Sequence, residues 1–397
     1  MAKSNKNTQN LYKLIRFFIL ILILIYATTI GLIHQYVNKP TVASVDALCP
    51  FGAIESFFSL VTVQIMLKRI AVSSFILLIA VLITAIIFRR TFCGNVCTLG
   101  TLQEIFARIG KKIFKKRLNV PSIIDKPLRY LKYIVLFVIL ILQLVILYQA
   151  VKAGNTNEME MVIRPYDPWA AYNHVLSSDL FNEFLVGFII LIIVLIGSLI
   201  YDRVFCKYLC PMGGFLGLIN RIGLFKVTRN KETCIDCKAC DKACPVNIKV
   251  QSLEKVNSSE CINCNECVNS CPVTDTLYVG GPKKLRVSPI VVTLVTLFIF
   301  VGIISITTAG GQFEWFQKSL IEETKKAGGE FDPALIKGRM SFEEVSITSG
   351  IPAEVFIEKY SITEEEFKKP IKESAEKYGF ETEDVRVFIK EYFEKNK

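Results

Sequence analysis

The sequence contains the run Cys234-x-x-Cys237-x-x-Cys240-x-x-x-Cys244-Pro245 and, a short hairpin later, Cys261-x-x-Cys264-x-x-Cys267-x-x-x-Cys271-Pro272. In each run, three cysteines spaced two residues apart let one tight loop place three thiolates around an iron–sulfur cubane. The fourth cysteine, followed by proline, is spaced to reach the neighbouring cluster. The spacing therefore predicts two [4Fe-4S] clusters, one held by Cys234, Cys237, Cys240 and Cys271 and the other by Cys261, Cys264, Cys267 and Cys244.

This doubled spacing is typical of bacterial two-cluster ferredoxins, so we expect a ferredoxin domain at residues 226–282. Structural zinc is the alternative, because cysteine pairs two residues apart also hold that ion. A zinc site needs only four thiolates, and two runs of four with a proline after each favour iron–sulfur clusters over zinc or disulfides. The motif indicates that electrons pass through this protein.

The rest of the chain is strongly apolar. Its 397 residues are 52% hydrophobic, with a mean hydropathy of +0.42, which is typical of membrane proteins. Five apolar runs without interior charges are long enough to cross a bilayer, at 17–33, 70–88, 133–151, 184–201 and 290–306. We expect an α-helical membrane protein with about five transmembrane helices. Its predicted parts are a membrane domain at 1–201, the inserted ferredoxin domain, a last span at 287–308 and a helical domain at 310–397.

The charge distribution predicts an orientation. The net charge of +11 comes from basic residues near the N-terminus and in the loops after the second and fourth runs, whereas the loop after the third run is acidic, with Glu158 and Glu160 among its residues. This is the positive-inside pattern of a cytoplasmic (inner) membrane protein, so nucleic acid is not an expected partner. It places the ferredoxin domain in the reducing cytoplasm and the C-terminal domain outside. The first run lacks a cleavage site, and we expect it to be an uncleaved anchor.

The membrane part contains an internal repeat. Its first half reads Cys49-Pro50-Phe51-Gly52, an apolar run, then Arg90-Thr91-Phe92-Cys93-x-x-x-Cys97-x-x-Gly100. Its second half reads Asp167-Pro168-Trp169-Ala170, an apolar run, then Arg203-Val204-Phe205-Cys206-x-x-x-Cys210-Pro211-x-Gly213, so the second cysteine motif extends to residue 213. Both halves run the same way, which predicts two parallel repeats around an axis normal to the bilayer. The inner ends of the second and fourth runs would then meet.

Four further cysteines lie at these inner ends. If their segments continue as helix, Cys93 and Cys97 share one face, and so do Cys206 and Cys210. Two such pairs at the repeat axis offer four thiolates, which would suit an additional iron–sulfur cluster. The alternatives are that they are packing cysteines or line a docking surface for the ferredoxin domain.

The outer side offers weaker candidates. Cys49 has no cysteine partner there, and the two histidines, His34 and His174, are candidates to ligate a haem or contact a quinone. Ordinary hydrogen-bonded loop histidines are the alternative. The same side carries the charged C-terminal segment, whose helix starts at Ser341 and Thr363 and stop at Gly379 predict a small helical domain for partner docking or as a lid.

Together, the two R-x-F-C-x-x-x-C turns, the Cys49-Pro50-Phe51-Gly52 segment and the double ferredoxin motif resemble the NapH/NosR/CcoG group of membrane polyferredoxins over roughly 17–308. The resemblance implies electron transfer between a quinol or cytoplasmic donor and a membrane or extracytoplasmic acceptor, as a quinol dehydrogenase-like subunit with redox partner proteins. The CcoG likeness implies an alternative, a maturation factor that reduces a metal ion or thiol for a membrane metalloenzyme. The chain lacks the flavin-attachment domain of NosR-like members, and its tail differs from the short end of NapH-like ones.

Overall fold

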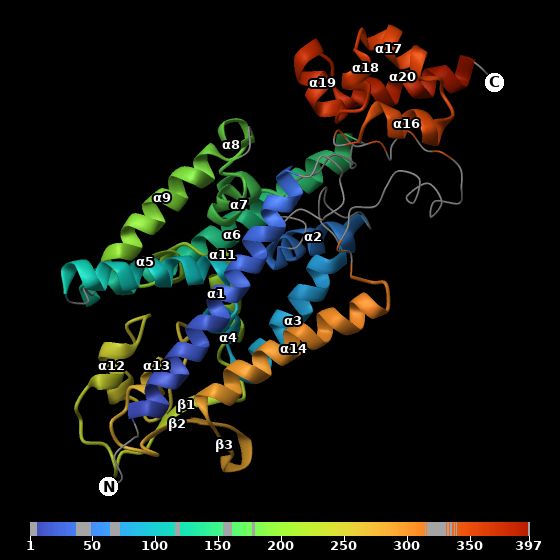
Figure 1. The fold of residues 1–397 in the computed structure, drawn as a ribbon. Coiled ribbons are helices and arrows are strands. Elements are labelled where there is room, and N and C mark those ends of the chain that lie inside the picture. The colour runs from blue at the N-terminus through green and yellow to red at the C-terminus, as the bar shows by residue number, and fades with distance from the viewer. Residues whose placement is uncertain are drawn as a thin grey trace. The chain divides into compact units, whose positions relative to one another are not determined.

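The structure is a computed structural model in which most of the chain consists of helices (Figure 1). It describes residues 6–36, 49–63, 72–115, 120–153, 161–176, 179–313 and 340–395, and the single positions 315, 331, 333, 336 and 338. The acidic pair at Glu158 and Glu160 lies outside these residues. The chain divides into two compact units, the first formed by Met1–Gln35 and Ser44–Glu314 and the second by Tyr36–Ala43 and Trp315–Lys397.

The helices of the first unit include three that are long and apolar enough to cross a membrane. These are α1 (Lys6–Tyr36), α6 (Ser122–Ala153) and α14 (Pro289–Ala309). Two further apolar helices, α3 (Val72–Phe88) and α9 (Leu185–Ile200), have 17 and 16 residues, fewer than the ~20 that a span normally needs. The structure therefore agrees with a helical membrane protein, and within the described residues three of the five predicted runs form helices with the length of a span.

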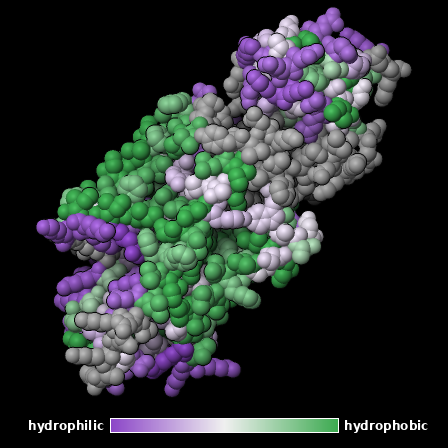
Figure 2. Space-filling view, in the orientation of Figure 1, coloured by the Kyte–Doolittle hydropathy of each residue, from purple (hydrophilic) through white to green (hydrophobic). Residues whose placement is uncertain are grey.

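Large hydrophobic side chains cover the outward faces of these helices (Figure 2). Phe18 of α1, Ile193 of α9 and Phe298 of α14 are 60%, 62% and 76% exposed. Such a surface would promote aggregation in water, but it is what a hydrocarbon environment requires. Inside the unit, α14 packs along α3, and α5 (Thr98–Phe114) packs along α9.

Short helices fill the ends of the membrane part. The first of these is the apolar helix α2 (Pro50–Val63). The remaining short helices of this part are α4 (Thr91–Asn95), η2 (Arg164–Tyr166), α7 (Pro168–Asn173), α8 (Asp179–Asn182), α10 (Val204–Tyr208) and α11 (Pro211–Ile219).

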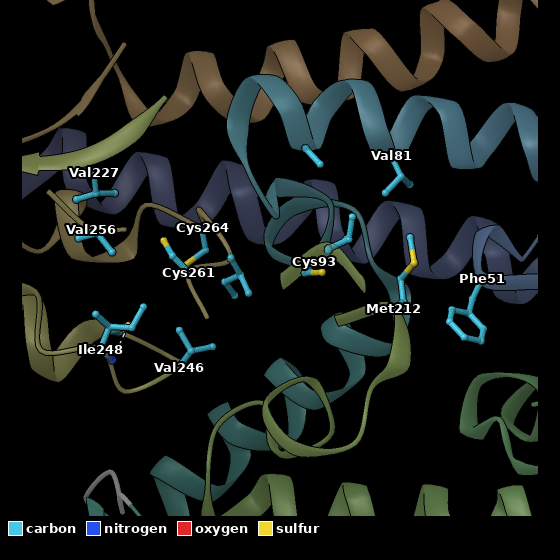
Figure 3. Close-up of a cluster of buried hydrophobic side chains, with 14 of the residues drawn as sticks. Phe51, Val81, Cys93, Met212, Val227, Val246, Ile248, Val256, Cys261 and Cys264 are labelled. Carbon is cyan, nitrogen blue, oxygen red and sulfur yellow. Dashed lines mark hydrogen bonds between the residues drawn. The ribbon is translucent and has the colours of Figure 1, made fainter. Parts of the chain in front are cut away.

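The ferredoxin segment folds around a small antiparallel sheet in the order β1-β2-β3, with Val227 opposite Val279. Its elements are β1 (Lys226–Arg229), α12 (Ala239–Ala243), η3 (Val250–Ser252), α13 (Glu266–Asn269), β2 (Leu277–Gly280), η4 (Pro282–Lys284) and β3 (Arg286–Val287). Buried side chains from this segment and from the membrane part belong to one continuous cluster. In Figure 3, Cys93 lies between Cys261 and Cys264 of the ferredoxin segment and Met212 and Phe51 of the membrane part.

The second unit is a small helical domain with its own core, in which Phe342 and Phe356 are fully buried. The predicted helix signals are confirmed. The Ser341 side chain accepts a hydrogen bond from the Glu344 amide, Thr363 and Glu366 form a capping box, and Gly379 ends a helix with φ of 74°. The helices are α16 (Phe342–Ser349), α17 (Ala353–Tyr360), α18 (Glu364–Phe367), α19 (Ile371–Tyr378) and α20 (Thr382–Lys395).

Candidate iron–sulfur and membrane-edge cysteine sites

The first cysteine pocket lies on the surface of the ferredoxin segment. Four of its lining residues are Cys234, Cys237, Cys240 and Cys271. The loop from Cys234 to Cys240 turns back on itself through two left-handed residues, Asp236 and Lys238, with φ of 51° and 58°. Because of these turns the three loop cysteines face one space, which we call the outer pocket. The Cys237 side chain is exposed at its rim.

The second pocket repeats this construction in a buried position, and we call it the inner pocket. Four of its lining residues are Cys244, Cys261, Cys264 and Cys267. Its loop turns through Asn263 and Asn265, with φ of 46° and 56°. Each pocket therefore gathers three cysteines from one run and the last cysteine of the other, the same two sets of four that the spacing predicts.

The donor chemistry of both pockets fits a cubane. Each offers four sulfur atoms from two loops, as a [4Fe-4S] cluster requires. Burial raises the pKa of the Cys240 and Cys264 thiols to about 12. Without bound iron these groups are therefore protonated at neutral pH, and cluster binding must displace their protons.

The four membrane-edge cysteines lie in two turns with the same backbone. In the first, Cys93 belongs to α4, the helix breaks, and Cys97 is the N-cap of α5. In the second, Cys206 belongs to α10 and Cys210 is the N-cap of α11. The expectation that each pair lies on one continuous helix is therefore wrong.

Matching hydrogen bonds define these turns. The amides of Cys97 and Cys210 each donate to a phenylalanine carbonyl five residues earlier, Phe92 and Phe205, both at 2.9 Å. Each second cysteine thus lies at the amino end of a helix, where free amides and the helix dipole favour a negatively charged sulfur. In the second turn the Gly213 amide donates to Cys210 Sγ at 3.2 Å.

The two turns bring their thiols together, and we call this place the four-cysteine site. Burial raises the pKa of Cys210 well above its ordinary value, and proximity to Cys206, Cys93 and Cys97 raises it further. Gln103 Nε2 donates to Cys206 Sγ at 3.3 Å. Among the described residues, neither this site nor the ferredoxin pockets bring three potential ligands close enough for a single metal ion. A cubane separates its ligands more widely, because each thiolate binds a different iron.

Two arginines cross between the turns. Arg90 of the first turn lies against Gly213 of the second, where a Cβ would come within 2.8 Å of Arg90 Nη2. Arg203 of the second turn lies against Gly100 of the first, and Arg203 Nη1 donates to the Cys93 carbonyl at 2.6 Å. Both arginines are 1% exposed. The exchange is reciprocal, as expected for two repeated motifs that face each other.

The inner pocket and the four-cysteine site are in direct contact. A Cβ on Gly94, the residue after Cys93, would lie 2.5 Å from the Ile262 carbonyl oxygen and 3.2 Å from Cys264 Cα. Arg16 of α1 joins the parts, because it donates to the Gly94 carbonyl at 2.8 Å and pairs with Glu104 and Glu266 at 2.8 and 3.0 Å. Glu104 also pairs with Arg203 at 3.0 Å.

Sequence reasoning did not assign roles to these contact residues. Arg90 and Arg203 are part of the repeated motif, and Glu104 is one of two acids in a basic loop, so the sequence does distinguish these three residues. The pairing of Arg16 with Glu266 joins residues 250 positions apart, and no sequence motif predicts it.

The remaining candidates lie elsewhere in the first unit. The Cys49 carbonyl accepts a hydrogen bond from Ser74 Oγ at 2.5 Å, just before α2 begins. His174 stacks on Phe184 with ring centroids 4.3 Å apart. His34 lies in the last turn of α1. These positions add no iron–sulfur donor set to the three described above.

Comparisons with known proteins agree with the cysteine patterns. The family model described as a 4Fe-4S binding domain matches twice, at residues 70–117 and 184–230, which are the two membrane-edge turns with the helices before them. The model described as a 4Fe-4S dicluster domain matches residues 226–272.

Three curated relatives are similar to this chain over longer stretches. The putative electron transport protein YccM of Escherichia coli is 29% identical over 66% of this chain and 72% of its own length. The uncharacterized protein MJ0750 of Methanocaldococcus jannaschii is 31% identical over 56% of this chain and 83% of its own length. The ferredoxin-type protein NapH of Haemophilus influenzae is 26% identical over 42% of this chain and 51% of its own length. No solved structure matches the chain.

Proposed function

We propose that this chain, which belongs to the NapH/NosR-type polyferredoxin-like membrane proteins, carries electrons from its ferredoxin segment to the membrane edge through three iron–sulfur sites. Two [4Fe-4S] clusters would occupy the outer and inner pockets, and an additional cluster would occupy the four-cysteine site. When bound, these clusters supply one-electron redox chemistry, and the protein supplies their position and surroundings.

The observation that carries this proposal is the uninterrupted contact between the sites. The cysteines of the inner pocket and Cys93 belong to one cluster of packed side chains, and Gly94 touches the backbone of Cys264. A chain of closely spaced carriers is needed because the hydrocarbon core is about 30 Å thick. The exposed position of Cys237 makes the outer pocket the place where a soluble donor would exchange electrons.

The proposal includes a topology. The ferredoxin segment lies in the cytoplasm and the C-terminal domain outside, in accordance with the distribution of basic residues. The partners are a cytoplasmic donor and a membrane or extracytoplasmic acceptor, either a redox protein or a quinone. Cysteine labelling with a membrane-impermeant reagent, at single cysteines introduced at Lys238 and Lys390, tests the topology in intact cells. Reaction at the first position or protection of the second would contradict it.

The cluster assignment is tested by counting iron and acid-labile sulfide in the anaerobically purified full chain, with EPR of the reduced protein. We expect about twelve iron atoms per chain from three cubanes. The variants Cys234→Ser, Cys264→Ser and Cys206→Ser should each remove or alter a different EPR signal. Cys49→Ser is the matched control, because this cysteine lies in none of the three sites, and it should leave the signals unchanged.

A count of eight iron atoms, with a spectrum that does not change in Cys206→Ser, would support the two ferredoxin clusters and refute a cluster at the four-cysteine site. A chain without stoichiometric iron would refute the whole assignment.

A further inference from the structure

The surroundings of the four-cysteine site contain an unusual pair of buried positive charges, the guanidinium groups of Arg90 and Arg203. Each is 1% exposed, and each comes from one repeat and lies against the other repeat's glycine. Within the described residues, the Nε atom of each guanidinium has no hydrogen-bond partner. A buried donor without an acceptor is costly, so this site is built for an acceptor or a negative charge that the protein atoms alone do not supply.

Both guanidinium groups lie beside the cysteine turn of the opposite repeat. Arg203 Nη1 donates to the Cys93 carbonyl at 2.6 Å and lies against Gly100, three residues after Cys97. Arg90 Nη2 lies against Gly213, whose amide donates to Cys210 Sγ at 3.2 Å.

The carboxylates that pair with these arginines are each shared with other basic groups. Glu104 pairs with Arg203 at 3.0 Å and also with Arg16 and Arg108. Glu260 lies 4.0 Å from Arg90 and accepts a closer bond, of 2.5 Å, from Lys132. Each carboxylate thus faces more than one positive charge, so net positive charge remains around the site.

The two ferredoxin pockets have mixed surroundings. At the outer pocket, Asp236 Oδ1 lies 3.5 Å from Cys234 Sγ and Asp241 Oδ1 lies 3.7 Å from Cys240 Sγ. Arg229 and Lys238 also line this pocket, and Arg229 pairs with Asp236 at 3.6 Å. At the inner pocket, Arg16 pairs at 3.0 Å with Glu266, two residues after Cys264. Opposite charges therefore offset each other at both pockets, whereas excess positive charge surrounds the four-cysteine site.

We propose that Arg90 and Arg203 are positioning residues that raise the reduction potential of the four-cysteine site. Electrons would then pass from the ferredoxin segment to the membrane edge. This inference rests on the proposed function, because it requires a cluster at the four cysteines. Four thiolates and an iron–sulfur core carry a net negative charge, which grows by one when an electron is added. Burial alone disfavours that added charge, and two fixed guanidinium groups in a low-dielectric site stabilise it.

In the transfer itself, a cluster held by the inner pocket would lose one electron and a cluster held by the four cysteines would gain it, with no bond made or broken. The potentials of the sites, which depend on charge, hydrogen bonds to sulfur and exposure, decide its direction.

The test is an EPR-monitored redox titration of the purified full chain, in which Cys206→Ser identifies the signal of the four-cysteine site. Arg203→Gln and Arg90→Gln should each make reduction of that site at least tenfold less favourable, a downward shift of about 59 mV for one electron. Arg203→Lys keeps the charge and should restore much of the potential. Lys112→Gln, which removes an exposed positive charge at the far end of α5, is the matched control and should leave the potential unchanged.

Gly100→Ala provides a milder perturbation. Its methyl group would overlap Arg203 Nη1, the movable end of a side chain, and push the guanidinium away while the charge remains in the protein. The reduction potential of the four-cysteine site should be lower in this variant. If a glutamine variant loses iron, this potential tests the role of the arginine instead.

An unchanged midpoint in iron-loaded Gln and Gly100→Ala variants would overturn the inference and leave the proposed cluster intact. A wild-type midpoint below that of the ferredoxin signals would overturn the proposed direction. If no signal responds to Cys206→Ser, the proposed third site itself fails.

Discussion

Arg16 connects the ferredoxin segment to the membrane part, and its removal should loosen that connection. The Arg16→Gln variant loses a 1% exposed guanidinium that pairs with Glu104 at 2.8 Å and Glu266 at 3.0 Å and donates to the Gly94 carbonyl at 2.8 Å. Breaking a buried ion pair typically costs about 3–5 kcal/mol. Because Glu104 keeps Arg203 and Arg108, each at 3.0 Å, we expect a value near the lower end, about 3 kcal/mol.

These contacts join α1, the first cysteine turn and the loop of the inner pocket, so the loss should appear as local opening of that loop. A change of about 3 kcal/mol corresponds to roughly a hundredfold higher population of the open state. Hydrogen–deuterium exchange of the backbone amides in residues 261–271, followed by mass spectrometry on the iron-loaded chain, measures this population. The amides should exchange roughly a hundredfold faster in Arg16→Gln than in the wild-type chain.

Arg108→Gln is the matched control. Arg108 pairs with the same carboxylate, but its side chain is 41% exposed, and an exposed pair contributes only about 0.2–1 kcal/mol. If residues 261–271 exchange at the wild-type rate in Arg16→Gln, or equally fast in both variants, Arg16 does not join the two parts as described.

Two other changes test the contact between sites and a buried carboxyl. Gly94→Ala would place a methyl group 2.5 Å from the Ile262 carbonyl oxygen, so the inner-pocket loop must move outward at a cost of about 1–3 kcal/mol. Stopped-flow reduction should show slower electron transfer to the four-cysteine site with unchanged iron content, and an unchanged rate would contradict direct contact. Glu55 of α2 is fully buried, and burial raises its pKa to about 8. The folded state therefore holds a proton that the unfolded state releases above its ordinary pKa, so stability falls as the pH rises from about 4.5 to about 8. Glu55→Gln should remove this dependence from the thermal midpoint measured between pH 5.5 and 8.5, and a persistent slope of the same size would assign it to other groups.

Much of the architecture follows from local sequence patterns. The spacing of the eight ferredoxin cysteines predicts two sets of four, because a loop with two residues between cysteines can direct only three sulfur atoms to one point. The helix signals at Ser341, Thr363 and Gly379 act within one turn of their own helices, and the structure confirms them. Apolar runs indicate a membrane protein because hydrophobicity is a property of composition, and in the part of the chain that the structure describes three of the five helices have the length of a span.

Local sequence patterns identify the residues that are chemically able to hold clusters, and they reveal the repeat of the two membrane-edge motifs. What surrounds these residues depends on the tertiary structure. The break between Cys93 and Cys97, the crossing of Arg90 and Arg203 to the opposite repeat, and the pairing of Arg16 with Glu266 all depend on contacts between distant segments. Periodicity and spacing report local geometry, whereas the balance of buried charge is set by which segments pack together, and that balance is what tunes a redox site.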